Sequence, residues 1–470
     1  MSIEPIGIAT FLIGLFCLAV GNGVLVPAVA LASLFGASAA LLIGAANIQP
    51  GHVMLGFLLI SVMSRRQDAA NMLRTLRPGE PGFWFACLTL YGVVSAFLLP
   101  RVLAGTTQIV ALGSSSYDET GSTIPLVPVS SNLTQSVYLT ANLLIFTAAA
   151  GIAARREGFL AVLAGLMAYS IGNTFFAFLD LATYSTGTQD VLGFMRNARY
   201  TLHTETEVAG MKRIVGSFTE AAAFARTTLG VIGFTGTLWL CGYRPAVTGT
   251  LAATSLVLLV LSTSTAGLAG APVILGVLFA TALFGSRTVF GGRTRAFALV
   301  FAPPLLLAAL LFVLLNAEAR SIVHEYLDMV ILQKGHSDSG IERSSWNRIA
   351  FQNFIDTGGL GVGLGTARTS SFAVALIATV GIPGTLFYGL FFTGALLRRR
   401  GEPGSFPSCV RLAARNACFG LLIGDLLVCP VIEQGLFFCL LAALASAYPE
   451  RDRAVVRAPM KSFVPLGLRA

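Results

Sequence analysis

Residues 296–315 read AFALVFAPPLLLAALLFVLL, a run of 20 residues without one charged or hydrogen-bonding side chain. An α-helix of about 20 residues crosses the roughly 30 Å hydrocarbon core of a bilayer. The apolar residues are continuous and do not alternate with polar ones, which favours a helix over a barrel strand. Because backbone amides in hydrocarbon must be paired within the segment, we expect a membrane-spanning helix.

The composition of the whole chain points the same way. Of its 470 residues, 55% are hydrophobic and only 11% are charged, and the mean hydropathy is +0.78. Soluble domains carry about 25% charged residues, so a soluble enzyme is excluded. The net charge of +9 is interpreted as contact with lipid head groups and as membrane topology, not as nucleic-acid binding.

Apolar segments recur along the chain and predict an all-α, polytopic transmembrane bundle. Several are shorter than the about 20 residues that an upright span needs, residues 51–63 in particular. We therefore expect 12 or 13 spans in one membrane domain covering residues 1–470, with the side of the N-terminus left open. The segments lie at about 6–20, 24–46, 51–63, 83–100, 136–154, 159–181, 222–240, 246–262, 267–284, 296–315, 369–396, 412–429 and 434–448.

Basic residues in the short connectors predict the orientation. If the spans alternate, one side receives Arg65, Arg66, Arg74, Arg77, Arg155, Arg156, Arg244, Arg287, Arg293, Arg295, Arg398, Arg399, Arg400 and Arg411. The tail 449–470 adds Arg451, Arg453, Arg457 and Lys461 on that side. Short cytoplasmic loops are enriched in Lys and Arg, so this side is expected to be cytoplasmic. The predicted location is a bacterial inner membrane, crossed many times.

Three long loops then lie on the outer side, at about 101–135, 182–221 and 317–368. The first is rich in Ser, Thr and Gly and is expected to be a flexible cover. The other two are basic, against the usual bias. Arginine binds phosphate in two-point contact and stays charged, so these two loops predict an anion site.

Two stretches in these loops are specific enough to suggest roles. Residues 212–220 read KRIVGSFTE and run directly into an apolar segment. Ser217 or Thr219 is expected to cap that helix, with Glu220 in its first turn. Residues 358–368 read GGLGVGLGTAR, and Gly363 and Gly365 are expected to hold an anion through backbone amides ahead of a helix. Before them, residues 341–355 predict an amphipathic helix.

These stretches resemble a known family. The residues KRxxGSFxEAxxFA at 212–225 are similar to the signature of O-antigen polymerase and ligase-like membrane proteins, closest to the exopolysaccharide repeat-unit polymerase branch. In the family's order follow LSTST at 261–265, RSSW at 343–346, GVGLG at 361–365 and GIPG at 381–384.

The resemblance implies a metal-independent, inverting glycosyltransferase at the outer face of the inner membrane, without a cofactor. The donor would be a glycan on polyprenyl pyrophosphate, and the acceptor a lipid-linked repeat unit. Membrane lipids and a chain-length regulator or export complex are further partners, and nucleic acid is not. The ligase branch carries a histidine where this chain has Thr366 to Ser371, which favours the polymerase and leaves a ligase as an alternative.

Site residues follow from the resemblance and the chemistry. Because the leaving group already carries negative charge, the work is mainly electrostatic, and Arg213, Arg343, Arg348 and Arg368 are expected to supply it. Glu220 is the first candidate for the base, with His336 or Glu342 second, whereas His52 and His203 are expected to be structural. The predicted pyrophosphate-binding set is Lys212, Arg213, Arg226, Arg343, Arg368, Gly363 and Gly365.

Other readings remain open. Asp180, Asp425 and Glu433 lie at or near span ends, as acids do along ion paths, so a proton-coupled transporter or flippase is the main rival. A non-enzymatic assembly component is a further possibility. The seven cysteines lie in apolar segments or at their edges without metal-ligand spacing, and we expect neither a metal site nor a disulfide.

Overall fold

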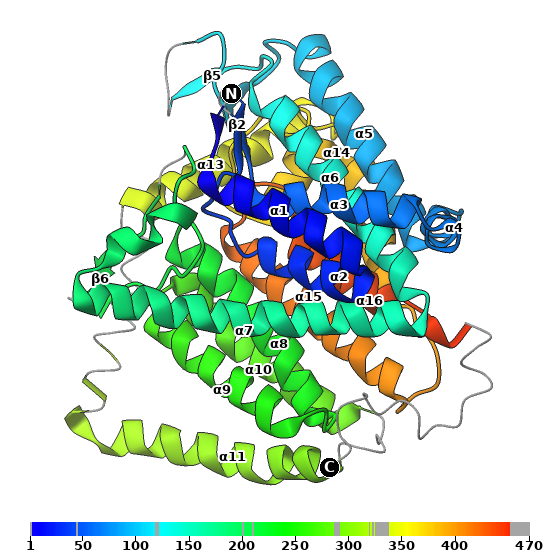
Figure 1. Cartoon of the computed structure of the whole chain (residues 1–470). Helices are drawn as coiled ribbons and strands as arrows, with labels where there is room; N and C mark the ends of the chain where they lie inside the picture. Colours follow the sequence, from blue (N-terminus) through cyan, green and yellow to red (C-terminus); the bar gives the residue numbers. More distant parts are fainter. Residues whose placement is uncertain are drawn as a thin grey trace.

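The computed structural model describes residues 2–43, 46–117, 122–199, 202–208, 211–285, 292–318, 320, 321, 324 and 338–451. It is an all-α polytopic bundle with very little sheet (Figure 1). Six helices are long and apolar enough to cross a membrane: α5 (Pro81–Val102), α6 (Ser131–Ala153), α7 (Arg156–Thr186), α10 (Thr265–Phe284), α11 (Gly292–Leu315) and α14 (Phe372–Phe392). The predicted fold class is confirmed.

The other helices complete the bundle. Five are apolar but shorter: α1 (Pro5–Val20), α2 (Asn22–Ala32), α3 (Pro50–Met63), α9 (Pro245–Leu261) and α16 (Gly435–Ser446). The rest are α4 (Arg66–Thr75), α8 (Ala221–Leu240), α13 (Asp338–Asp356) and α15 (Phe406–Val428), with the short turns η1 (Gln189–Met195), η4 (Thr393–Leu397) and η5 (Pro449–Arg451). A helix lies at every predicted apolar segment, and the amphipathic helix predicted at 341–355 is confirmed as α13.

One predicted segment, 24–46, is wrong in its second half. Helix α2 ends at Ala32, and the chain then forms a small antiparallel sheet from β1 (Ser2–Ile3), β2 (Leu41–Ile43) and β3 (Ala46–Ile48). Two more hairpins occur, β4 (Gln108–Val110) with β5 (Thr123–Pro125), and β6 (Glu207–Val208) with β7 (Met211–Lys212). Apolar composition alone does not distinguish a short buried strand from the end of a helix.

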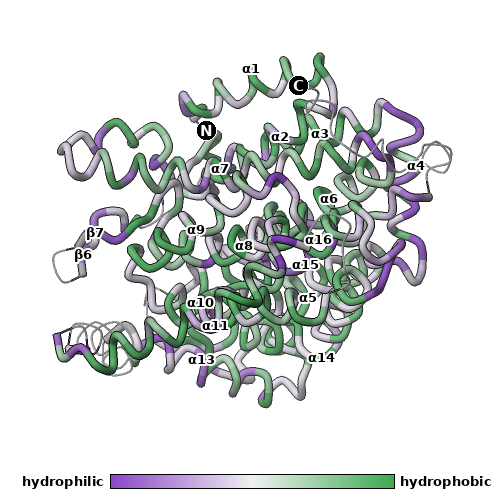
Figure 2. The backbone as a smooth tube through the Cα atoms, turned by 90° about the horizontal axis from the view of Figure 1, so that it is seen from below, coloured by the Kyte–Doolittle hydropathy of each residue, from purple (hydrophilic) through white to green (hydrophobic). Residues whose placement is uncertain are grey.

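Helix α7 connects two polar faces of the molecule. Its 31 residues make it about 46 Å long. Next to its first turn, Arg155 forms an ion pair of 2.9 Å with Asp68 of α4. At its other end, the Tyr184 ring lies 5.4 Å from the Lys212 ammonium of β7. Figure 2 shows hydrophilic residues at α4 and at β6–β7, with hydrophobic helices between. We call these ends the basic face and the loop face.

The first long loop is folded in its described part, contrary to the expected flexible cover. Ile109 and Ile124, from β4 and β5, form a small buried core with Leu126, Val129, Val362 and Ala367. Helix α13 is tied to the same hairpin, because Asn353 donates to Thr107 Oγ1 at 2.9 Å and Thr107 donates to Asp356 at 2.7 Å. This second bond, with one from Gln352, lowers the pKa of the Asp356 carboxyl. The loop face is therefore a packed layer.

Candidate functional site

A cavity of about 160 Å³ lies toward the loop face of the bundle. It is bounded by the starts of α3 and α8, the middles of α6 and α7, and the turn that joins α15 to α16. Its polar lining comes from Ser33, Gln49, His52, Tyr138, Tyr169, Arg226, Thr227, Glu433 and Gln434, and its apolar lining from Phe218, Ala223, Leu436 and Phe437. The size suits one small polar group, since sites that hold drug-sized ligands measure about 300–1,000 Å³.

Arg226 is the cation of this cavity. It lies in the second turn of α8, and both its Nε and its Nη2 donate to the carboxylate of Asp425 on α15, the latter at 3.0 Å. Nη2 also donates to the carbonyl of Gln434 at 2.8 Å. The Nη1 donors have no partner among the described residues, so they are open to a ligand. The fully buried Asp425 therefore fixes an arginine whose remaining donors are available.

Glu433 lies in the turn between α15 and α16 and lines the same cavity. Its carboxylate accepts a hydrogen bond of 2.9 Å from Asn142 of α6. Burial raises the pKa of the Glu433 carboxyl, and the Asn142 bond and the nearby Arg226 oppose part of that shift. A carboxyl with a raised pKa exchanges a proton closer to neutral pH than an exposed one, which suits acid–base work.

His52 also lines the cavity, from the first turn of α3. Its ring lies 5.1 Å from the ring of Tyr138. Both imidazole nitrogens are buried, and neither has a hydrogen-bond partner in the part of the chain that the structure describes. Buried polar atoms are normally paired, so an orphaned imidazole beside a cavity points to a ligand or a proton-transfer role. His52 was predicted to be structural from the sequence, and its place in the cavity makes it a candidate site residue.

Lys212, predicted to bind pyrophosphate, instead pairs with a carboxylate of the protein. Its ammonium lies 3.4 Å from the carboxylate of Asp180, which also pairs with Arg196 at 2.7 Å. The other carboxylate oxygen of Asp180 accepts the backbone amides of Val215 and Gly216. Burial lowers the pKa of the Lys212 ammonium, and Asp180 opposes part of that shift. Asp180 thus organises loop 182–221, and Lys212 serves as its counter-charge.

Arg213 and Glu220 lie in the same loop and are partly buried. The amide of Arg213 donates to the carbonyl of Thr206 at 3.1 Å. The predicted cap is wrong: α8 begins at Ala221 with Glu220 itself at the N-cap position and without a side-chain cap bond, while the Ser217 hydroxyl donates to the carbonyl of Leu34. Glu220 is not among the cavity residues, although Phe218 and Ala223 on either side of it are.

Of the residues predicted in loop 317–368, Glu342, Arg343 and Arg348 lie on α13, and Arg368 lies against it. Arg348 and Glu342 are exposed and Arg343 is partly buried. The guanidinium of Arg368 lies 5.0 Å from the ring of Trp346, a cation–π contact. His336 lies outside the described residues. In Figure 2, α13 and the β6–β7 hairpin lie apart, so the described parts of the two basic loops are separate.

The glycine-rich stretch 358–368 precedes the N-terminus of α14, as predicted, and it also serves as a packing element. Helix α14 begins at Phe372, seven residues after Gly365. The amide of Gly363 donates to the carbonyl of Thr379 at 3.0 Å and is therefore occupied. A Cβ on Gly363 would lie 2.6 Å from the Ser95 carbonyl, and one on Gly365 2.6 Å from the Ser131 carbonyl. With φ of 96° and 77°, both positions require glycine.

Of the predicted site residues, the cavity therefore contains Arg226. Asp425 holds that arginine in place, and Glu433 lines the cavity; both were noted in the sequence only as acids near span ends. His52 follows Pro50 at the start of an apolar segment, a position that could have marked it as a buried polar group near a membrane surface. In the described residues, no group of three His, Cys, Asp or Glu side chains is placed to hold a metal.

Comparison of the chain with protein-family models, with curated proteins and with solved structures gave no match.

Proposed function

We propose that this protein is a polysaccharide polymerase that transfers a growing glycan from polyprenyl pyrophosphate to a lipid-linked repeat unit at the outer face of a bacterial inner membrane. The observation that carries the proposal is the cavity that Arg226, Glu433 and His52 line together. In the sequence, Arg226 comes directly after the 212–225 stretch that resembles the polymerase signature. The polytopic fold and the packed loop face are compatible with a substrate that enters from the membrane.

The chemistry asks for few groups. The anomeric carbon is attacked by an acceptor hydroxyl, the bond to the pyrophosphate oxygen breaks, and the hydroxyl proton goes to a base. Arg226 is suited to the phosphate oxygens, because its Nη1 donors are open and its position is fixed by Asp425. The cavity has room for a phosphate group, and the glycan would extend beyond it.

His52 and Glu433 are the candidates for the base, in place of Glu220. His52 is the better one, because neither of its ring nitrogens is engaged by a described residue, whereas Glu433 is already bonded to Asn142. Arg213 stays a candidate for the outer phosphate or the glycan, since it lies in the loop that ends at the cavity.

The test is chain extension in proteoliposomes. The full-length protein is supplied with polyprenyl-pyrophosphate-linked repeat units isolated from cells that lack it, with no ion gradient. We expect polymer and released polyprenyl pyrophosphate from the wild type. His52→Gln should lower the extension rate by about 10²–10⁴-fold, the usual contribution of a general base. The exposed His203 provides the matched control, and His203→Gln should extend chains normally.

Arg226→Lys keeps a cation for Asp425 but loses the Nη1 donors that are open to the phosphate, so it should lower the rate without loss of folded protein. Arg213→Ala should also lower polymer yield with normal membrane insertion. The proposal would be refuted if the wild type did not extend chains. It would also be refuted if the His52→Gln variant and the Arg226→Lys variant both extended them at the full rate.

A proton-coupled transporter is the second candidate, and the buried Glu433 with its raised pKa favours it. The same proteoliposomes separate the two functions. Transport predicts movement of the lipid-linked substrate that depends on a pH gradient and is lost in Glu433→Gln, without longer glycans. Extension in the absence of a gradient would exclude transport as the main activity.

A further inference from the structure

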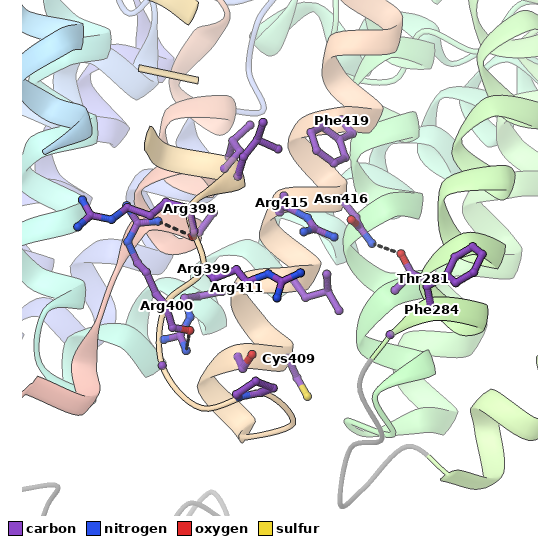
Figure 3. A pocket seen from close by; sticks show the side chains of 18 of the residues that line it. Thr281, Phe284, Arg398, Arg399, Arg400, Cys409, Arg411, Arg415, Asn416 and Phe419 are labelled. Atoms are coloured by element: carbon purple, nitrogen blue, oxygen red, sulfur yellow. Dashed lines mark hydrogen bonds between the residues drawn. The ribbon is translucent and has the colours of Figure 1, made fainter. Parts of the chain in front are cut away.

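A larger cavity, of about 550 Å³, lies at the basic face, away from the site described above. It is enclosed by the end of α10, the connector 398–404 and the first half of α15 (Figure 3). Its volume falls in the range of sites that hold small molecules. Five arginines line it and no carboxylate does, among the residues that the structure describes: Arg398, Arg399, Arg400, Arg411 and Arg415.

Two of these arginines are fixed by several bonds, and Arg398 donates to the carbonyl of Gly79 at 3.5 Å. Arg411 makes a two-point ion pair with Glu450, at 2.9 and 2.8 Å, and donates to the carbonyl of Arg400. Arg400 donates to the carbonyls of Gly394 and Ala395 at the end of η4. These bonds fix the connector and close one wall of the cavity, so neither arginine is counted here as a ligand-binding group.

Arg399 and Arg415 have no such commitments. Neither side chain makes a hydrogen bond or ion pair with a described residue, and in Figure 3 both extend into the same space. The Nε of Arg415 is buried without an acceptor among the described residues, and its guanidinium lies 5.7 Å from the Phe419 ring. A buried guanidinium N–H without an acceptor is unfavourable, and an anionic oxygen from a ligand would relieve it.

The basic bias of cytoplasmic connectors accounts for the exposed Arg399 but not for the partly buried Arg415. That bias requires only arginines in contact with water or lipid head groups, as Arg77 is after α4. Here one arginine projects from a helix into a cavity with one of its donors buried. The remaining wall is mostly apolar and includes Val277, Phe284 and Leu397, with Thr281, Ser408 and Asn416 as its polar members. Phe284 is 82% exposed and Leu397 is 51% exposed, as expected for side chains that face lipid.

We propose that this cavity binds the phosphate head group of an anionic membrane lipid, with the phosphate between Arg399 and Arg415 and the acyl chains along the end of α10. A phosphate oxygen would take the open guanidinium donors, and the apolar wall would take the start of the chains. A free phosphate would satisfy the arginines but would leave the apolar wall uncovered. The inference does not depend on the proposed glycan chemistry.

The experiment measures lipid binding to the purified full-length protein in a neutral detergent. The probes are short-chain phosphatidylglycerol, phosphatidylcholine with the same chains, and inorganic phosphate. Binding of each probe is measured by thermal unfolding and by native mass spectrometry. We expect phosphatidylglycerol to raise Tm and to bind, and the other two to have little effect. Arg399→Gln and Arg415→Gln should each weaken binding by about tenfold, the effect of losing one charge-assisted bond.

Arg77→Gln is the matched control, because it removes an exposed arginine of the same face outside the cavity. It should bind phosphatidylglycerol as the wild type does. Since Arg399 and Arg415 make no bond to the described chain, their variants should have a normal Tm without lipid, which separates lost binding from lost folding. Equal weakening in Arg77→Gln, or equal protection by inorganic phosphate, would overturn the lipid assignment.

Discussion

At the scale of single residues, buried carboxylates hold basic side chains in place. Asp180 and Asp425 are both fully buried, and each has cationic partners. Asp180 fixes loop 182–221 through Arg196, Lys212 and two backbone amides, whereas Asp425 fixes one arginine at the cavity. The same residue types therefore have different roles. Arg196 and Lys212 neutralise Asp180 inside the folded loop, whereas Arg226 pairs with Asp425 and keeps its Nη1 donors unbonded among the described residues.

Asp180→Asn tests the role of the first carboxylate. It leaves Arg196 and Lys212, which are 8% and 4% exposed, without their counter-charge. Breaking a buried ion pair in this way costs about 3–5 kcal/mol. We expect faster hydrogen exchange over residues 211–217 and a lower Tm in detergent. Asp190→Asn, at an exposed position of the same loop, should change neither. Unchanged exchange at 211–217 in Asp180→Asn would show that the loop is held by other contacts.

At the scale of elements, helices α8 and α15 pack closely through their glycines. Gly230 of α8 lies against Gly420 of α15. Gly420 and Gly424 have the GxxxG spacing that lets membrane helices approach. A Cβ on Gly420 would lie 2.4 Å from the Leu229 carbonyl, and one on Gly424 2.9 Å from the Cα of Arg226. This approach brings Asp425 to Arg226, so the geometry of the cavity depends on these glycines.

Gly420→Leu should therefore force the two helices apart. Overpacking typically costs about 1–3 kcal/mol, and the contact here is with rigid backbone, so the upper part of that range is expected. The measurement is Tm in detergent together with chain extension, and both should fall. Gly276→Leu is the matched control on α10, because a Cβ there meets nothing within 4 Å. A normal Tm for Gly420→Leu would contradict the close packing of α8 on α15.

The sequence predicts elements better than it predicts contacts, for physical reasons that these elements illustrate. Hydrophobic runs and the period of 341–355 depend on local composition, and they located the helices. The pairing of Arg226 with Asp425 joins residues 199 positions apart, and no local pattern encodes it. The glycines at 363 and 365 resembled an anion-binding turn, because sequence alone cannot distinguish a positive φ used for binding from one used for packing.

At the scale of the whole molecule, the two polar faces carry different chemistry. The loop face holds the cavity of Arg226, Glu433 and His52, and the basic face holds the five-arginine cavity. Helix α7 spans the distance between them, with Arg155 and Asp68 near one end and Tyr184 and Lys212 near the other. If the basic face is cytoplasmic, a glycan site on the loop face is outside, and a lipid site faces the cytoplasmic leaflet.

Cysteine labelling tests this orientation. Ser344→Cys places a thiol on an exposed position of α13, and Arg74→Cys places one on an exposed position of α4. Six of the seven native cysteines are buried and Cys87 is half-buried, so the unmodified protein should give little background. The cells are first converted to spheroplasts, which keep the inner membrane sealed. A membrane-impermeant maleimide should then label Ser344→Cys, whereas Arg74→Cys should react only after the inner membrane is permeabilised. The reverse pattern would place the loop face in the cytoplasm. It would refute the proposed polymerase at the outer face, but the lipid cavity would stand with its leaflet exchanged, because that inference depends on the arginines and not on their side.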